Sequence, residues 1–350
     1  MKKRYLVLQD GTVFEGYAFG ADKQNIGELI FNTNMVGYIE TLTDPSYYGQ
    51  IIVQTFPMIG NYGIIESDFV GEPKLKGYVV REWCEAPSNF RCEYDIDKFL
   101  KEHDIPGIYG VDTREITNII RTKGTLNAVI CDEIPDSLDD VVSYKVFAAV
   151  ENTGCKNKTE YVPKSGAEEH IAVIDFGSSK HLETYLMDEG FKVTMMPYNS
   201  SAEDILSLGA DALVLTEGPG DPKENTVAIE EIAKLFGKIP MLGIGLGHQI
   251  MALAKGADTK KLLYGHHGSN QPCKIVGTAR SLITSQNHGY AVDADSIKCG
   301  TVSHLNGNDG TVEGIAYEGE FALSVQFEAS QDLILENITK LMEEFDNAAG

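Results

Sequence analysis

The stretch Pro240-Met-Leu-Gly-Ile-Gly-Leu-Gly-His-Gln249 decides the fold of the second half of the chain. Met241–Ile244 predicts a short buried strand, and His248–Lys255 predicts a helix, so a sharp glycine turn joins them. The central residue of such a turn is held above the sheet beside the free backbone N–H groups of the next helix. Nucleophile elbows use this geometry, with small residues on both sides to allow close packing. The position that would carry the nucleophile is Gly245, which has no side chain.

Two other interpretations of this stretch stay open. It is also compatible with a plain glycine turn between strand and helix. A dinucleotide-binding fingerprint is disfavoured, because His248 stands where that motif has its last glycine.

The loop Gly218-Pro-Gly-Asp-Pro222 follows another predicted strand end, and its backbone amides could hold an anion or a polarised carbonyl. Two such loops in successive strand–helix units favour a functional site.

Outward from the elbow, strands alternate with helices. This pattern predicts parallel pairing in a sheet covered by helices, with sites at the carboxyl ends of the strands. The predicted strands are 171–176, 191–196, 212–216 and 241–244, and the predicted helices are 182–189, 201–208, 226–236 and 248–255. The segment 274–327 is richer in strand-like patterns.

The first half differs, with short strands divided by glycine turns and helical pattern mainly in 96–103 and 114–122. It predicts a mixed α/β domain over residues 1–150. Residues 151–168 are polar and rich in turn formers, which predicts a linker. A second α/β domain, with a mainly parallel sheet, is predicted over 169–350.

Composition narrows the class of protein. The 350 residues hold 29 basic and 52 acidic side chains, a net charge of −23, which disfavours binding to phosphate backbones. No apolar run approaches the roughly 20 residues of a membrane span, and the basic start ends its apolar run too early for a signal peptide. The six cysteines show no CxxC spacing. A reduced cytoplasmic enzyme or enzyme subunit is expected.

Four long stretches of the first half carry a specific pattern: 27–38, 43–50, 60–63 and 110–117. They resemble the small subunit of carbamoyl phosphate synthetase. In the second half the class I glutamine amidotransferase motifs are matched by Asp175-Phe-Gly, Gly218-Pro-Gly-Asp-Pro, Gly247-His-Gln, Gly265-His-His-Gly, Ser285-Gln-Asn-His-Gly-Tyr-Ala-Val292 and Ser324-Val-Gln-Phe. The first-half stretches are specific to that subunit and disfavour other glutamine amidotransferases.

The resemblance implies a known chemistry. In that family an elbow Cys attacks the side-chain amide of glutamine, a His activates the Cys, and a Glu orients the His. The released ammonia is used by a large subunit, with bicarbonate and ATP, to make carbamoyl phosphate for pyrimidine or arginine biosynthesis; ATP and magnesium belong to that partner, and this chain needs no cofactor. The family's glutamine contacts map onto Ser46, Gly218, Gly220, Leu246, Gln249, Asn287, Gly289 and Tyr290. The amides of Gly218 and Leu246 are the expected oxyanion donors.

The chain departs from the family where the chemistry is done. Gly245 replaces the Cys, and Phe327 joins Glu328 directly because the family's His-Pro is missing, so only Glu328 of the triad remains. Glu217 stands where Asn is usual, which adds negative charge near the pocket. After Asp175-Phe-Gly the usual Lys is Ser179, with Lys180 one place later.

These departures predict a synthetase small subunit whose glutaminase step is lost or severely impaired and whose role is docking. Rescue by another nucleophile and base would need residues from a small set: Ser178, Ser179, His248, His266, His267 and His288. A glutamine-binding sensor or scaffold without chemistry is the alternative, and a change introduced by engineering is a third possibility. No metal site is expected, because the histidines form no HExxH or paired Cys/His pattern.

Overall fold

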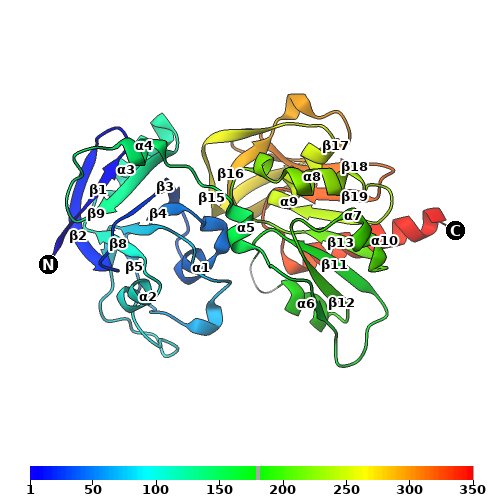
Figure 1. The fold of residues 1–350 in the computed structure, drawn as a ribbon, viewed down its shortest axis with the longest axis horizontal. Helices are drawn as coiled ribbons and strands as arrows, with labels where there is room; N and C mark the ends of the chain where they lie inside the picture. The colour runs from blue at the N-terminus through cyan, green and yellow to red at the C-terminus, as the bar shows by residue number, and fades with distance from the viewer. Residues whose placement is uncertain (179–181, 350) are drawn as a thin grey trace. The chain divides into compact units, whose positions relative to one another are not determined.

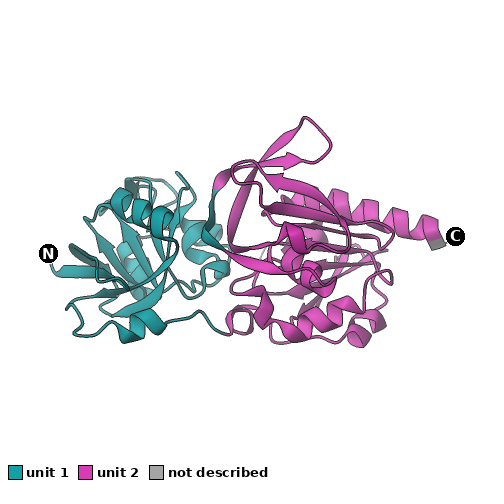
Figure 2. Ribbon diagram, turned by 90° about the horizontal axis from the view of Figure 1, so that it is seen from above, with its two compact units in different colours: residues 1–147, 262–268 teal, residues 148–261, 269–350 magenta. Residues whose placement is uncertain are grey.

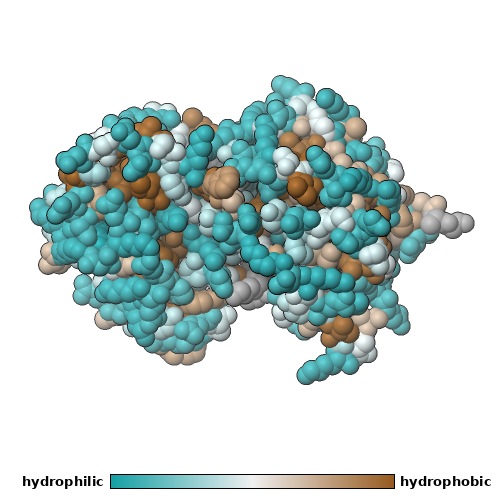
Figure 3. Space-filling model, in the orientation of Figure 1, coloured by the Kyte–Doolittle hydropathy of each residue, from teal (hydrophilic) through white to brown (hydrophobic). Residues whose placement is uncertain are grey.

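The computed structural model describes residues 1–178 and 182–349, which form two compact units. Unit 1 comprises Met1–Phe147 and Leu262–Gly268, and unit 2 comprises Ala148–Lys261 and Ser269–Gly350 (Figure 2). No helix among the described residues is long and apolar enough to cross a membrane. Hydrophilic residues cover most of the face drawn in Figure 3.

Unit 1 is built on a closed sheet. Its strands are, in spatial order, β1 (Lys3–Leu8), β2 (Val13–Gly20), β8 (Pro106–Tyr109), β6 (Gly77–Val80), β4 (Gln50–Gln54), β3 (Asn25–Asn32) and β9 (Leu126–Cys131), which pairs back with β1. The short strands β5 (Met58–Ile59) and β7 (Glu82–Trp83) pair separately. Alternate residues point into the closed sheet and are fully buried, as Leu6 and Leu8 are on β1.

Helices complete unit 1: α1 (Tyr38–Thr43), α2 (Ile96–Glu102), α3 (Thr113–Lys123) and α4 (Asp139–Ser143) (Figure 1). The two predicted helices, 96–103 and 114–122, are α2 and α3. Each starts at an Asp whose side chain accepts a hydrogen bond from the first turn, Asp95 for α2 and Asp112 for α3. The mixed α/β character predicted for the first half is confirmed.

Unit 2 is a ten-stranded sheet with helices on both faces of its parallel part (Figure 1). The parallel strands are β12 (Lys192–Pro197), β11 (His170–Asp175), β13 (Ala212–Leu215), β14 (Met241–Ile244) and β19 (Ala322–Val325). The helices are α5 (Ala149–Thr153), α6 (Leu182–Asp188), α7 (Ala202–Ser207), α8 (Thr226–Ala233), α9 (Leu246–Ala254) and α10 (Gln331–Ala349).

Alternating side chains divide this core into two layers. On β11, Ala172 and Ile174 pack with residues of α7, α8 and α9, while Ile171 and Val173 pack with α6 and α10. The near-continuous apolar sequence of β11 follows, because both faces of the strand are covered. The predicted helix 201–208 is α7, and Ser201 caps it by accepting the N–H of Asp204.

The sheet continues beyond β19 as antiparallel strands, which are β18 (Val312–Tyr317), β17 (Thr301–Asn306), β15 (Thr259–Ile275) and β16 (Ser281–Val292). They account for the strand-rich pattern of 274–327. The α/β fold class is confirmed, and within this ten-stranded sheet the parallel pairs are those of β12–β11–β13–β14–β19.

The segment 151–168 is more structured than a plain linker. It contains the end of α5 and the edge strand β10 (Thr159–Tyr161), which pairs antiparallel with β12. The residues of β10 are mostly exposed, so they carry no apolar period that the sequence could reveal.

Candidate functional site

The turn after β14 has an elbow's backbone. Gly245 adopts φ 55° and ψ −111°, between the last residue of β14 and the first of α9. Its N–H donates to the carbonyl of Val325 on β19 (2.9 Å), and the N–H of Gly247 donates to the carbonyl of Thr216 (3.0 Å). These bonds hold the turn against the strand on each side. Helix α9 therefore begins at Leu246, earlier than the predicted His248.

The flanking glycines are required by packing. A Cβ on Gly243 would lie 2.9 Å from the backbone carbonyl oxygen of Gly247, and a Cβ on Gly247 would lie 2.4 Å from the carbonyl oxygen of Leu215. Neither distance is compatible with a side chain, so helix α9 sits on β13 and β14 only because both positions lack one.

Gly245 faces the residue that precedes the glycine loop. A Cβ on Gly245 would lie 3.0 Å from Cβ of Glu217 and 3.9 Å from the carbonyl oxygen of Gln326. Glu217 is half-buried and directly follows Thr216 at the end of β13. Two departures from the family pattern, at 217 and 245, therefore lie against each other.

The loop Gly218–Pro222 has a local structural explanation as well as a functional one. A Cβ on Gly218 would lie 2.4 Å from the carbonyl oxygen of Phe176, and Gly220 has φ 91°. Asp221 caps a short 3₁₀ helix by accepting the N–H of Lys223. The glycines are thus needed for the loop to close against the end of β11. As the first residue of α9, Leu246 has a backbone N–H without an intrahelical acceptor, which is what an oxyanion donor requires.

Gln249 is buried on the first turn of α9 and is held from two sides. Its Nε2 donates to the carbonyl of Tyr290 (2.8 Å) and to Oε1 of Gln326 (2.8 Å). Both amide hydrogens are therefore used within unit 2, and the side chain offers a ligand only its oxygen. Nε2 of Gln326 is buried and has no partner among the described residues.

The remaining predicted contacts of unit 2 lie on β16. Asn287, Gly289 and Tyr290 are half-buried there. Gln286 and His288 alternate with Asn287 and Gly289, so they point to the opposite face, where both are buried. The structure thus brings Gln249 and Tyr290 into contact, while Ser46 belongs to unit 1, where its N–H donates to Asp44 Oδ1.

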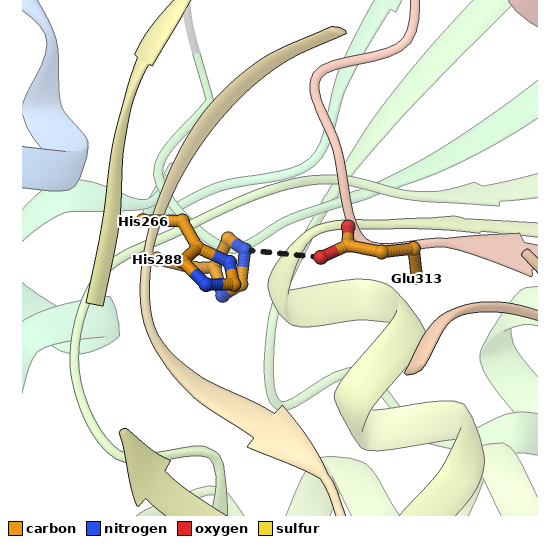
Figure 4. A group of neighbouring side chains, drawn as sticks. All are labelled: His266, His288 and Glu313. Carbon is orange, nitrogen blue, oxygen red and sulfur yellow. Dashed lines mark ion pairs between the residues drawn. The ribbon is translucent and has the colours of Figure 1, made fainter. Parts of the chain in front are cut away.

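A buried acidic residue, Glu313 on β18, lies behind β16. Figure 4 shows its carboxylate facing His288, with 3.9 Å between Oε1 and His288 Nε2. Figure 4 also draws His266, which belongs to unit 1. Glu313, Gln286 and Asn306 hydrogen-bond to one another and are at most 2% exposed. Sequence reasoning missed Glu313, Asn306 and Gln326 as site-related residues; only Gln326 lies in a quoted motif.

The chain closes without a gap where His-Pro is absent. After β19 it bends through Gln326 and Phe327, and the N–H of Glu328 donates to the carbonyl of Ser285 (3.0 Å). Phe327 is buried against the ring of His304. Glu328, the predicted remaining member of the triad, is exposed.

His248 occupies the interior of unit 2. It is fully buried, and its Nδ1 lies 2.8 Å from Oγ of Ser324. Burial, and to a lesser extent the positive charge of a protonated His304, lowers the pKa of His248 to about 3. The imidazole is therefore neutral near pH 7 and is held by β19.

Three more residues of the predicted rescue set are described: Ser178, whose Oγ donates to Asp175 Oδ1, and His266 and His267, which belong to unit 1. Ser179 lies outside the described residues, as does Lys180. Burial raises the pKa of Cys273 to about 12, so its thiol stays protonated at neutral pH.

Comparison with known proteins agrees with both units. Residues 6–130 match the family model for the carbamoyl-phosphate synthase small chain, CPSase domain, and residues 172–329 match that for glutamine amidotransferase class-I. A carbamoyl phosphate synthase small chain from Listeria monocytogenes is 43% identical over 99% of this chain and 96% of its own length. One from Staphylococcus epidermidis is 46% identical over 93% and 90%. The chain therefore belongs to the carbamoyl phosphate synthase small chain family, and its second unit carries a class I glutamine amidotransferase domain.

Proposed function

We propose that this chain serves as the small subunit of a carbamoyl phosphate synthase and has lost, or nearly lost, its own glutaminase step. It docks on a large subunit that uses free ammonia. The observation that carries the proposal is the elbow at Gly245, whose backbone conformation is retained without a side chain to form a thioester.

The base is missing as well as the nucleophile. Glu328 is exposed, and the two residues between the end of β19 and Glu328 are Gln326 and Phe327, neither of which is a histidine. His248 is neutral, buried and bonded to Ser324. In a serine protease, loss of the nucleophile lowers turnover on the order of 10⁶-fold, which corresponds to roughly 8 kcal/mol of barrier. Backbone donors alone cannot replace that.

Docking is supported by what is kept. The small-chain relatives match almost the full length of this chain, including unit 1, which holds none of the family's triad. Retention of this domain alongside the predicted loss of the catalytic residues supports continued binding to the large subunit.

The test is ammonia release from glutamine by the purified chain, alone and with its large subunit, beside an intact small chain as the control. We expect release at the background rate in both states, together with carbamoyl phosphate formation by the complex from ammonium. Turnover from glutamine close to that of the intact relative would refute the proposal.

A glutamine-binding sensor is the second candidate. The bonds that fix Gln249 against Tyr290 and Gln326 favour it, because they keep part of the predicted pocket in place. Glu217, half-buried next to Gly245, opposes it by adding negative charge. Calorimetry separates the two: saturable binding of glutamine without ammonia release supports the sensor.

A further inference from the structure

We propose that Glu313 is a positioning residue, whose buried carboxylate fixes His288 and, through it, the strand and helix that carry the predicted glutamine contacts. The functional meaning of this assignment rests on the second candidate function, glutamine binding, whereas the assignment itself is argued from the direction of the hydrogen bonds around Glu313.

The direction of the hydrogen bonds around Glu313 can be assigned from the backbone N–H of Asn308, which can only donate. The N–H of Asn308 donates to Oδ1 of Asn306 (2.8 Å), which fixes the orientation of that amide. Nδ2 of Asn306 therefore points the other way, toward Glu313 Oε1 (3.3 Å) and Gln286 Oε1 (3.2 Å).

The second oxygen of Glu313 is also an acceptor. Nε2 of Gln286 donates to Glu313 Oε2 (3.0 Å) and to Oγ1 of Thr284 (3.2 Å), which in turn donates to a backbone carbonyl. Since both carboxylate oxygens accept from amide groups, Glu313 has no oxygen that needs to carry a proton, and this arrangement fits the ionised form.

A buried carboxylate requires a compensating charge. Nδ1 of His288 lies 2.8 Å from the carbonyl oxygen of Tyr290, and a carbonyl only accepts, so Nδ1 carries a proton. Nε2 of the same ring faces two acceptors, Gln286 Oε1 at 3.4 Å and Glu313 Oε1 at 3.9 Å. A proton on Nε2 makes His288 a cation beside Glu313 (Figure 4).

Glu313 and His288 are connected to the predicted glutamine contact Gln249 by two sets of hydrogen bonds. The Tyr290 carbonyl that accepts from His288 also accepts from Gln249. The backbone carbonyl of Glu313 accepts the N–H of Gln326, whose side chain accepts from Gln249. These hydrogen bonds, together with the ion pair between Glu313 and His288, form a closed ring through Glu313, His288, Tyr290, Gln249 and Gln326. Because β16 alternates, anchoring His288 on the inner face also fixes Asn287 and Gly289 on the other.

The test compares Glu313→Gln with the full-length parent. A glutamine amide at 313 sets its NH₂ against the NH₂ of Gln286 or of Asn306, whose orientation Asn308 fixes, and it removes the charge. The matched control is Thr194→Val. It removes a buried hydrogen bond between Thr194 on β12 and His170 on β11. Nitrogen NMR of the histidine-labelled chain at pH 7 reports the protons on each of eight rings, with His288 assigned by its loss in His288→Asn.

We expect both ring nitrogens of His288 to be protonated in the parent and in Thr194→Val, and only Nδ1 in Glu313→Gln. We also expect amide hydrogen exchange in 286–290 to quicken about tenfold or more in Glu313→Gln only. A singly protonated His288 in the parent overturns the proposal, even if Glu313→Gln fails to fold; so does a Glu313→Gln protein that leaves His288 and the exchange unchanged. Neither readout needs glutamine, so a failure to bind glutamine counts only against the pocket assignment.

Discussion

At the turn after β14 the backbone adopts φ 55° and ψ −111° although Gly245 has no side chain. Around Gln249, by contrast, side chains are connected: Gln249 donates to Gln326 and to the Tyr290 carbonyl, which also binds the ring of His288, and His288 lies 3.9 Å from Glu313. The turn at Gly245 has the backbone geometry of an elbow without the side chain of a nucleophile, while the polar residues around Gln249 are connected to one another by hydrogen bonds. We infer that the close packing at Gly243 and Gly247 contributes to the conformation of the turn, and the predictions below test this inference.

The largest effect should come from restoring the missing groups. Gly245→Cys combined with insertion of His-Pro between Phe327 and Glu328 should raise ammonia release from glutamine by at least roughly 10³-fold, because it returns both nucleophile and base to a retained elbow. Ammonia release by the purified variants measures this.

Gly245→Cys alone is the control for that experiment. It should stay within about tenfold of the parent, since no imidazole activates the thiol. It should also lower the free energy of unfolding by about 1–3 kcal/mol, because a side chain at φ 55° is strained and meets Glu217. High activity of the single variant would break the argument that two groups are missing.

Packing at the elbow gives the next largest effect. Gly247→Ala should lower the free energy of unfolding by about 3 kcal/mol, because its Cβ would lie 2.4 Å from the Leu215 carbonyl oxygen. Gly289→Ala, where a Cβ meets nothing within 4 Å, should cost less than about 1 kcal/mol. Denaturant unfolding compares them, and equal costs would contradict the packing account.

The sequence predicted the local elements of unit 2 well. Ile171–Val173 is apolar on both faces and Ser201 is a strong N-cap, so β11 and α7 follow from neighbouring residues alone. It could not predict that β1 pairs with β9 to close the sheet of unit 1. That pairing joins residues far apart in the sequence, such as Tyr5 and Cys131, and no local pattern specifies it. The role of Glu313 was hidden for the same reason, since its partners come from β16 and β17.

The buried His248 should make the free energy of unfolding depend on pH. Its pKa is lowered to about 3 in the folded chain, so between that value and about 6.5 the unfolded chain binds more protons. Stability is therefore lost as the pH falls below 6.5, by at most about 1.4 kcal/mol per pH unit from this group. Unfolding at pH 6.5 and pH 5 should show a smaller pH difference in His248→Gln than in the parent. An unchanged difference would show that His248 is not buried as a neutral ring.

A smaller effect is expected at Gln326, one of the residues in the closed ring of contacts around Gln249. Gln326→Leu removes the acceptor for Gln249 Nε2, but it also removes a buried Nε2 that has no partner among the described residues. The two contributions oppose each other, so the free energy of unfolding should change by about 1 kcal/mol or less. A loss above about 3 kcal/mol would indicate that Gln326 Nε2 has a partner such as a buried water.

The smallest effect should be that of Glu328→Gln. The side chain is exposed, so the free energy of unfolding should change by less than about 0.5 kcal/mol, and ammonia release should stay at background. In an intact triad this residue would orient the His, so a clear fall in ammonia release would mean that Glu328 still supports catalysis.

The central claim is that no residue of this chain can form an acyl intermediate from glutamine. Acid quenching of the complex during incubation with glutamine, followed by intact-mass analysis of this chain, tests it most directly. The account predicts an unchanged mass, whereas an intact small chain gains a glutamyl group. A glutamyl adduct on any side chain of this protein would contradict the account.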